Sequence, residues 1–394
     1  MFCRKKNTVV LNDICIFVKI KNISIMITRF KVSNFKGFNT QFVFNLKETN
    51  SYTFNEESIK NGIVNNAVIY GANAVGKSNL GLAMFDIINH LTDKQINESR
   101  YTNYLNALNK TNEATFEYEF VFDGNDVIYK YAKVGLRTII SESFYINGKL
   151  LASIDRAVSE KAEINFKGAE TLKRHIPNNN LSILKYIKNN SLLDDNNENR
   201  NLNKFFEFVD KMLHFSSLQD NMHFGKAINK TAIGDDIIKK GNVSDLESLL
   251  NLAGINCKLS VVNELGKDII AFDFNGEKIA YYKIASSGTK SLILFYFWLQ
   301  RLREYKISFL FIDEFDAFYN HKLSKLIINE LKKTGVQFIL TTHNTSIIAN
   351  DLLRPDCYFL MNNSAIKPFS KCTSKEIRKA HNLEKMYKGN IFII

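Results

Sequence analysis

Hydrophobic and polar positions alternate along two stretches of the chain, residues 26–46 and 114–150. This period of two is typical of β-strands with one buried face. Within the second stretch, Asp123-Gly124-Asn125-Asp126 separates two alternating runs, and Asn147-Gly148 marks a further turn. Asp-Gly and Asn-Gly pairs between such runs favour tight hairpins. The pattern therefore predicts an antiparallel β-meander in the N-terminal part of the chain.

Continuous apolar runs follow a different rule. They cover residues 66–70, 308–313 and 336–341, and such runs are typical of parallel strands that are covered on both faces. Residues 76–91 and 289–304 have the apolar spacing and length of helices. Together these segments predict an α/β fold, with a mixed parallel sheet beside an antiparallel β-lobe.

The middle of the chain, residues 157–256, has a mainly helical pattern with Asn-rich connections, and residues 257–283 return to strands. No sustained heptads or internal repeats occur, which excludes a long coiled coil. Aromatic residues in the middle segment could line a partner surface, but the core is their more common place; they are Phe205, Phe206, Phe208, Phe215 and Phe224. The expected organisation is an N-terminal extension (1–25), the first part of a head (26–156), a helical insertion (157–256) and the second part of the head (257–394).

Composition narrows the class of protein. The 394 residues carry a net charge of +12, five scattered cysteines and no C-x-x-C pair, which indicates neither a disulfide framework nor a zinc site. Residues 1–25 supply +4 of this charge, so the basic excess elsewhere is mild and leaves a nucleic-acid partner open. No window is apolar enough for a membrane span, and we expect a cytoplasmic protein without a membrane partner. The alternation that begins at Met26 suggests that Met26 is the native start.

One motif carries phosphate chemistry. Residues 71–78 fit G-x-x-x-x-G-K-[ST], between an apolar strand and a helical pattern; they are Gly71, Ala72, Asn73, Ala74, Val75, Gly76, Lys77 and Ser78. Backbone amides and the helix N-terminus attract an anion in such a loop. Lys77 would reach the β- and γ-phosphates, and Ser78 would hold Mg²⁺. A Gly-rich turn without a ligand is the competing interpretation, and the strand–loop–helix order disfavours it.

Acidic residues end the next buried strand, at Asp313-Glu314. The carboxyl ends of parallel strands are where α/β sheets bind ligands. Asp313 suits Mg²⁺ coordination, and Glu314 is placed to act as general base on an attacking water. An apolar strand capped by acids is common by itself, so the assignment depends on the preceding P-loop.

The order of two further segments in the chain, relative to the P-loop and the acidic strand, indicates that they contact the nucleotide. His343 ends the third apolar strand, which would bring its imidazole near the γ-phosphate, whereas a lone His at a strand end is otherwise only a surface residue. Ser286-Ser287-Gly288-Thr289 precedes a helix and could be a simple cap. Between a P-loop and an acidic strand, Gly288 would permit close approach of phosphate and Ser287 could donate to a γ-oxygen.

This order of motifs resembles ABC-type ATPases of the AAA class. The wording of Tyr70–Asn79, Asp313–Asp316 and Thr341–Thr345 is similar to the soluble group with RecF-like, chromosome-maintenance and phage-defence (abortive-infection, OLD-like) ATPases. The C-terminal segment 378–387 is similar to the standalone defence members of that group. The resemblance covers residues 26–394 and implies ATP and Mg²⁺ as ligands, with Asn79 part of the nucleotide-binding loop.

The resemblance also implies an assembly. Two subunits would meet head to tail, so that Ser286–Thr289 of one closes on ATP held by Lys77 of the other, with Asp316 at the position that contacts across the dimer. The usual Q-loop glutamine is not evident, and Glu142 is a weak candidate for its place. The middle segment is too short for the long arms of chromosome-maintenance proteins, and no length remains for a nuclease domain.

The sequence thus predicts a Mg²⁺-dependent ATPase, most consistent with the sensor of a prokaryotic defence system that controls a separate effector such as a nuclease. Two alternatives remain: a RecF-like DNA-repair ATPase that binds DNA, and a nucleotide-gated scaffold whose turnover is incidental. Salt-dependent duplex binding strengthened by ATP would favour the first alternative. Full biological activity of a Glu314→Gln protein would favour the second.

Overall fold

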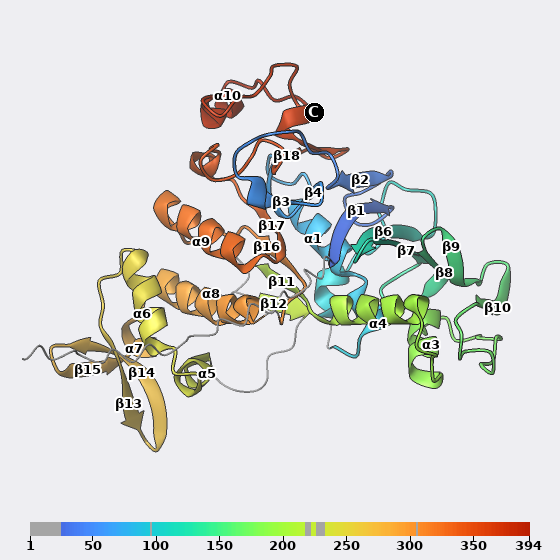
Figure 1. The fold of residues 1–394 in the computed structure, drawn as a ribbon, viewed down its shortest axis with the longest axis horizontal. Coiled ribbons are helices and arrows are strands. Elements are labelled where there is room, and N and C mark those ends of the chain that lie inside the picture. The colour runs from blue at the N-terminus through green and yellow to red at the C-terminus, as the bar shows by residue number, and fades with distance from the viewer. Residues whose placement is uncertain (1–24, 95–96, 217–221, 226–232, 305) are drawn as a thin grey trace, which may run out of the picture.

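The structure is a computed structural model, and it describes residues 25–94, 97–216, 222–225, 233–304 and 306–394, with the backbone alone for 222–225. The prediction of an N-terminal extension and a start at Met26 falls on residues 1–24, which lie outside the described residues. The first strand begins at Ile25. In Figure 1 the meander strands lie to the right, a small three-stranded sheet lies at the lower left, and the central sheet lies between them.

The N-terminal lobe is a seven-stranded antiparallel sheet in the order β10-β9-β8-β7-β6-β1-β2. Its strands are β1 (Ile25–Ser33), β2 (Phe42–Asn45), β6 (Ala114–Phe122), β7 (Asn125–Lys133), β8 (Ile139–Ile146), β9 (Lys149–Asp155) and β10 (Ser159–Ile164). Burial alternates along β6, as its sequence pattern predicts. The predicted β-meander is confirmed.

A second seven-stranded sheet forms the centre, in the order β12-β11-β16-β17-β5-β18-β19. Its strands are β5 (Asn66–Tyr70), β11 (Met212–Ser216), β12 (Met222–Gly225), β16 (Phe309–Asp313), β17 (Gln337–Thr341), β18 (Tyr358–Met361) and β19 (Ile366–Pro368). The five inner strands run parallel, and the two edge strands are antiparallel. Strands β5, β16 and β17 are buried along their whole length, which confirms the mixed α/β class.

Helices cover the central sheet and join it to the lobe. They are α1 (Lys77–Phe85), α2 (Ile88–Leu91), α3 (Ile183–Asn190), α4 (Asn197–Asp210), α5 (Ile233–Lys239), α6 (Val243–Leu252), α7 (Tyr281–Ile284), α8 (Ser287–Arg303), α9 (His321–Thr334) and α10 (Leu383–Lys388), with short 3-10 turns at Glu56–Ser58, Glu98–Tyr101, Thr345–Ile347 and Phe369–Lys371. Helix α1 packs on β16 and β11, and α8 lies along α9 (Figure 1). The buried side chain of Gln337 bonds to the backbone of Ile27, so it links the two large sheets.

The structure corrects the expected helical insertion over residues 157–256. Residues 159–164 form β10, the edge strand of the lobe, and residues 212–216 form β11 inside the central sheet. Helices α3 and α4 contact α2 and are therefore part of the lobe. Helices α5 and α6 contact α8 and the small three-stranded sheet. The segment is thus shared among the lobe, the central sheet and this small sheet, and it is not a separate helical block.

The aromatic residues of that segment belong to the core where the structure describes them. Phe205, Phe206, Phe208 and Phe215 are buried, and Phe205 packs against the rings of Phe120 and Tyr129 in the lobe. The side chain of Phe224 lies outside the described residues. A partner surface at these aromatics is therefore not supported.

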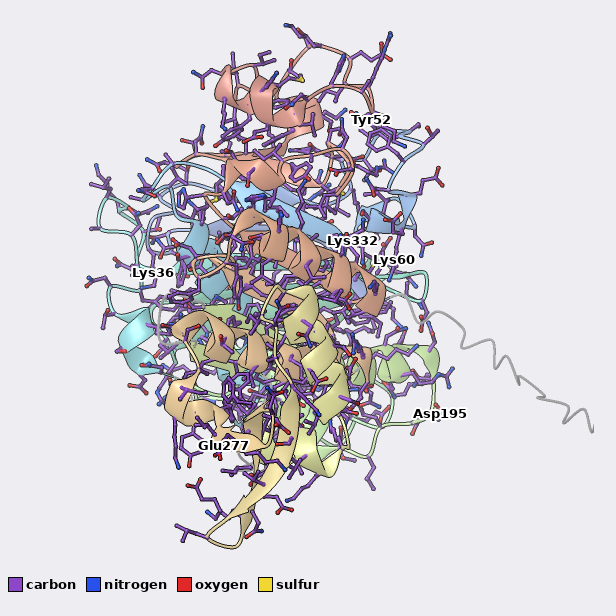
Figure 2. The ribbon with its side chains drawn as sticks, turned by 90° about the vertical axis from the view of Figure 1, so that its left-hand side faces the viewer. Lys36, Tyr52, Lys60, Asp195, Glu277 and Lys332 are labelled. Atoms are coloured by element: carbon purple, nitrogen blue, oxygen red, sulfur yellow. The ribbon has the colours of Figure 1, made fainter. Side chains whose placement is uncertain are left out.

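A small antiparallel sheet precedes the signature segment. It contains β13 (Leu259–Glu264), β14 (Lys267–Phe274) and β15 (Glu277–Ala280). A separate two-stranded ribbon is formed by β3 (Ile59–Lys60) and β4 (Ile63–Val64). Figure 2 labels Glu277, the first residue of β15, near the end at which this sheet extends from the body. None of the helices that the structure describes combines the length and apolar character needed to cross a membrane.

Candidate functional site

The predicted site residues come from three strands that end at one edge of the central sheet. Strand β17 pairs in parallel with both β16 and β5, with Leu340 opposite Ile312 on one side and opposite Val68 on the other. The loops that follow these three strands therefore begin side by side. Carboxyl ends of parallel strands are the usual place for ligands in such sheets.

The loop after β5 has the backbone that a phosphate cradle needs. A Cβ atom on Gly71 would lie 2.4 Å from the carbonyl oxygen of Met361, so only glycine fits against β18. Gly76 has φ +100° and Ala74 has φ +63°, both in the left-handed region. Helix α1 begins at the next residue, Lys77, so its N-terminal amides point into the loop.

Lys77 lies inside this loop with only neutral partners. Its Nζ donates to the carbonyl oxygens of Gly71 and Ala72, each at 3.0 Å, and lies 2.9 Å from Nε2 of His343. The lysine is 6% exposed. Among the described residues, no carboxylate comes within ion-pair distance of this ammonium. The structure thus brings Lys77 and His343 together, as predicted, around a positive charge that lacks a negative partner.

The pKa values of this pair agree with the geometry. Burial lowers the pKa of Lys77, while the carboxylates of Glu314 and Asp313 oppose the shift. Burial and the positive charge of Lys77 lower the pKa of His343. The imidazole of His343 is therefore neutral at pH 7, and its Nε2 can accept the hydrogen bond from Lys77.

Thr341, the last residue of β17, holds the acidic pair. Its hydroxyl donates to Oδ1 of Asp313 at 2.7 Å, and the backbone N–H of Glu314 donates to the same hydroxyl oxygen at 2.8 Å. Glu314 has φ +48°, an uncommon conformation for a residue with a side chain. Such strain concentrates at functional sites, and here it accompanies the turn of the chain away from the strand end.

Asp316 lies two residues further along and is bonded within its own chain. Its carboxylate accepts from the hydroxyl of Thr342 at 2.6 Å and from the hydroxyl of Ser324 at 3.3 Å. Both threonines of the Thr-Thr-His segment therefore support the acidic loop. In this state of the single chain, Asp316 faces inward.

The signature segment caps helix α8. The side chain of Ser286 accepts from the backbone N–H of Thr289, while Ser286 and Ser287 are exposed. On its inner side Gly288 faces the carbonyl oxygen of Phe318. Within the described part of the chain, no hydrogen bond or ion pair joins Ser286–Gly288 to Gly71–Ser78. The two predicted halves of the nucleotide site are thus not brought into contact within one subunit.

The donor set near the P-loop fits Mg²⁺. The hydroxyl of Ser78 is exposed in the first turn of α1, and the carboxylate of Asp313 ends β16. Mg²⁺ prefers oxygen ligands and is usually held by one or two carboxylates together with phosphates and water. The described residues contain no cluster of three or more His, Cys, Asp or Glu side chains, so an all-protein metal cage is not found there.

The sequence motifs do not predict two features near the site, the side chain of Arg100 and the strand β11. Arg100 is partly buried, and this burial lowers the pKa of its guanidinium, while Tyr101 and the carboxylate of Asp313 oppose the shift. This guanidinium therefore adds positive charge in the neighbourhood of the acidic pair. Strand β11 runs beside β16, with Ser216 opposite Asp313, although its short apolar run was not distinguishable from a helical segment.

Glu142 is not at the site. Its carboxylate is buried in the lobe, where it accepts from the hydroxyl of Ser182 at 2.7 Å and the backbone N–H of Ile183 at 2.8 Å. It therefore caps helix α3 and cannot replace the Q-loop glutamine.

Comparison with known proteins identifies a family for this chain. A family model described as "AAA domain, putative AbiEii toxin, Type IV TA system" matches residues 67–349, well over half of the chain. This range includes the P-loop, the signature, the acidic pair and His343, and it ends before the C-terminal segment 378–387. No curated protein matches the chain.

Solved structures give distant resemblances. The SmcHead bound to the C-winged helix domain of ScpA has 16% identity and a TM-score of 0.46, covering 86% of this chain and 96% of that one. The SMC head domain from Thermotoga maritima has 14% identity and a TM-score of 0.43, covering 87% and 98%. The Smc head domain with an extended coiled coil, bound to the C-terminal domain of ScpA derived from Pyrococcus furiosus, has 12% identity and a TM-score of 0.46, covering 87% and 95%.

Proposed function

This chain belongs to the AAA family with AbiEii-type members, and from that premise and the site geometry we propose that it binds and hydrolyses ATP with Mg²⁺. The observation that carries the proposal is the ammonium of Lys77. It is 6% exposed, lies at the N-terminus of α1 and has only neutral acceptors around it. A buried charge without a counter-charge is costly, and the phosphates of a nucleotide would supply one.

The chain's own groups divide the work of hydrolysis. The P-loop amides and Lys77 bind and orient the phosphates, and Ser78 and Asp313 would hold Mg²⁺. Mg²⁺ held by these residues would supply positive charge against the phosphates. Thr341 fixes the orientation of the Asp313 carboxylate through its 2.7 Å hydrogen bond.

Glu314 is the general base in this proposal. The backbone N–H of Glu314 donates a hydrogen bond to the hydroxyl of Thr341. This contact fixes the backbone of Glu314 next to Asp313. The carboxylate would take a proton from the attacking water. His343 reaches Lys77 and would therefore exchange this contact for one with the γ-phosphate when the nucleotide is present.

A complete site requires two subunits. Ser286, Ser287 and Gly288 are turned outward at the start of α8, and no polar contact among the described residues joins them to the P-loop of their own chain. We infer that they close on the nucleotide of a second copy, head to tail, with Asp316 released toward the partner. ATP would favour the closed dimer, and hydrolysis would reopen it.

The biological role that fits an ATP-driven dimer is the regulation of another protein. Membership of an AAA family with AbiEii-type toxins supports a prokaryotic defence role, in which the ATPase senses infection in the cytoplasm and controls a separate effector such as a nuclease. A RecF-like role in DNA repair and a nucleotide-gated scaffold are the alternatives.

Replacing Lys77 by alanine tests the proposal. We expect Lys77→Ala to abolish ATP binding or turnover while its circular dichroism stays that of the wild type, because the fold does not depend on a buried ammonium without a counter-charge. Lys388→Ala, at the exposed end of α10, is the matched control and should keep the full rate. Equal ATPase rates of purified wild type and Lys77→Ala would refute the assignment.

A further inference from the structure

Exposed apolar side chains gather before the signature segment. Of the thirteen large apolar side chains exposed in the described part of the chain, six fall within residues 261–284. They are Val261, Leu265, Phe274, Ile279, Tyr282 and Ile284. These residues belong to the three-stranded sheet and α7, which extend from the body in both views (Figures 1 and 2). Concentrated apolar exposure of this kind marks an interaction site.

Two of these side chains share a cavity with the signature. The cavity has a volume of about 470 Å³, and its walls include Phe272, Phe274, Ile284, Ser286 and Thr289. Phe274 is 55% exposed and Ile284 is 46% exposed at this position. Any molecule seated on Ser286 therefore also lies against the apolar mouth of the cavity.

A third exposed apolar residue, Phe318, has its backbone next to the signature. The carbonyl oxygen of Phe318 faces Gly288, and its side chain is 44% exposed. The neighbouring Tyr319 is fixed to α8 by a 2.6 Å hydrogen bond with Ser291. The signature thus has exposed apolar residues beside it, and we call Phe274, Ile284 and Phe318 the signature-flanking patch.

We propose that the signature-flanking patch is covered by a second copy of this chain when ATP closes the dimer, so that apolar burial adds to the nucleotide contacts. This inference rests on the proposed function, because a second copy of the chain is expected at the patch only if Ser286–Gly288 bind the nucleotide of that copy. Ser286 caps α8 in its own chain, whereas in the proposed function Ser287 and Gly288 meet the P-loop of another copy. Phe274 and Ile284 line one cavity with Ser286, so they border the same contact surface.

The charges around the patch disfavour a nucleic acid as the occupant. Residues 258–290 contain five lysines and four acidic residues, so the segment has almost no basic excess. The ammonium of Lys283 and the hydroxyl of Tyr282 both bond to Glu264, each at 2.6 Å. Phosphate binding needs clustered positive charge, whereas apolar burial beside paired polar groups suits a protein surface.

The test uses the full chain with Glu314→Gln, which is expected to bind ATP without hydrolysing it and so to accumulate the closed dimer. The dimer dissociation constant is measured by light scattering with ATP and Mg²⁺ over a range of protein concentrations. Adding Phe274→Asp, or separately Ile284→Asp, should raise this constant by roughly tenfold or more, as expected for a central apolar contact. Fluorescent ATP-analogue binding to the monomer should not change.

Leu192→Asp is the matched control, because Leu192 is equally apolar and is exposed on the lobe, away from the signature. It should leave the dissociation constant as it is. If Glu314→Gln dimerises with ATP and both patch variants dimerise equally well, the patch inference is overturned while the proposed function stands. If Glu314→Gln binds ATP but never dimerises, the head-to-tail function itself fails, and the inference fails with it.

Discussion

Gly81 decides how closely the P-loop helix can approach the central sheet. A Cβ atom there would lie 2.7 Å from Nε2 of His214 on β11 and 2.7 Å from the ring of Phe311 on β16. Both neighbours are buried and their rings stack on one another, with an interplanar angle of 7°. The missing side chain is thus a packing requirement of α1, ten residues after Gly71, the first residue of the phosphate loop.

Gly81→Ala should therefore destabilise the protein, although alanine favours a helix. The gain in helix propensity is about 1 kcal/mol, whereas overpacking a tight core costs about 1–3 kcal/mol. We expect a net loss in the free energy of unfolding, together with weaker ATP binding because α1 is displaced. Urea denaturation measures the first effect.

Gly135→Ala is the control, since no atom lies within 4 Å of the added Cβ and its φ is not positive. Equal unfolding midpoints of Gly81→Ala and wild type would show that the helix can shift without cost, against this account.

At the residue scale, the sequence predicts the side chains that would contact the nucleotide better than the residues that hold those side chains in place. Local sequence motifs predict Lys77 and His343, and in the structure Nζ of Lys77 lies 2.9 Å from Nε2 of His343. Thr341 could not be assigned as the support of Asp313, because that contact depends on the pairing of strands 28 residues apart. The environment of Glu142 was equally invisible, because nothing local tells a buried capping carboxylate from an exposed one.

At the element scale, helix α2 is tied to the lobe through buried polar side chains. His90 on α2 makes a 2.8 Å hydrogen bond with the hydroxyl of Tyr129 on β7, and Tyr129 donates to Glu142 on β8 at 2.9 Å. Burial, with Lys133 and Lys185 nearby, lowers the pKa of His90 well below its ordinary value of 6.5. The folded protein therefore keeps this imidazole neutral where the unfolded chain would protonate it.

This difference predicts a pH dependence with a definite sign. Below pH 6.5 the unfolded state binds one more proton than the folded state, so stability falls as the pH falls. The raised pKa of Glu142 acts in the opposite direction and is present in both proteins compared. Between pH 7 and pH 5, wild type should lose about 2 kcal/mol more free energy of unfolding than His90→Gln.

Urea denaturation at the two pH values checks this prediction. His175→Gln, which replaces an exposed histidine, should behave as wild type. Parallel pH profiles of wild type and His90→Gln would mean that His90 is not held neutral.

Strand β11 marks the limit of prediction at this scale. The alternating runs identified the lobe strands β1, β2, β6, β7 and β8 but not β10, and the continuous apolar runs identified β5, β16 and β17. The run Met212–Phe215 is short and follows a true helix, α4, so propensity alone could not separate it from that helix. Its place beside β16 is fixed only by pairing with a strand almost 100 residues away.

At the scale of the whole molecule, the separation of the P-loop from Ser287 makes a composite site testable by mixing. Lys77→Ala should lose nucleotide binding, and Ser287→Arg should keep binding but block closure. A heterodimer of the two contains one site with wild-type Lys77 and wild-type Ser287. Mixing the two inactive proteins should therefore restore part of the ATPase rate.

Each variant alone, at the same total concentration, is the control for mixing. If heterodimers are detected by mass and the rate does not recover, Ser287 does not act on the partner's nucleotide, and the head-to-tail arrangement is wrong.

The central claim, that Glu314 drives ATP hydrolysis from its place beside Asp313, is tested most directly by single-turnover hydrolysis in Glu314→Gln. The amide keeps the shape of the side chain and removes the base, so the rate should fall by about 10²–10⁴-fold. ATP affinity should change little, because Lys77, Ser78 and the loop amides remain. Hydrolysis within a few-fold of the wild-type rate, with ATP bound, would contradict the mechanism at its centre.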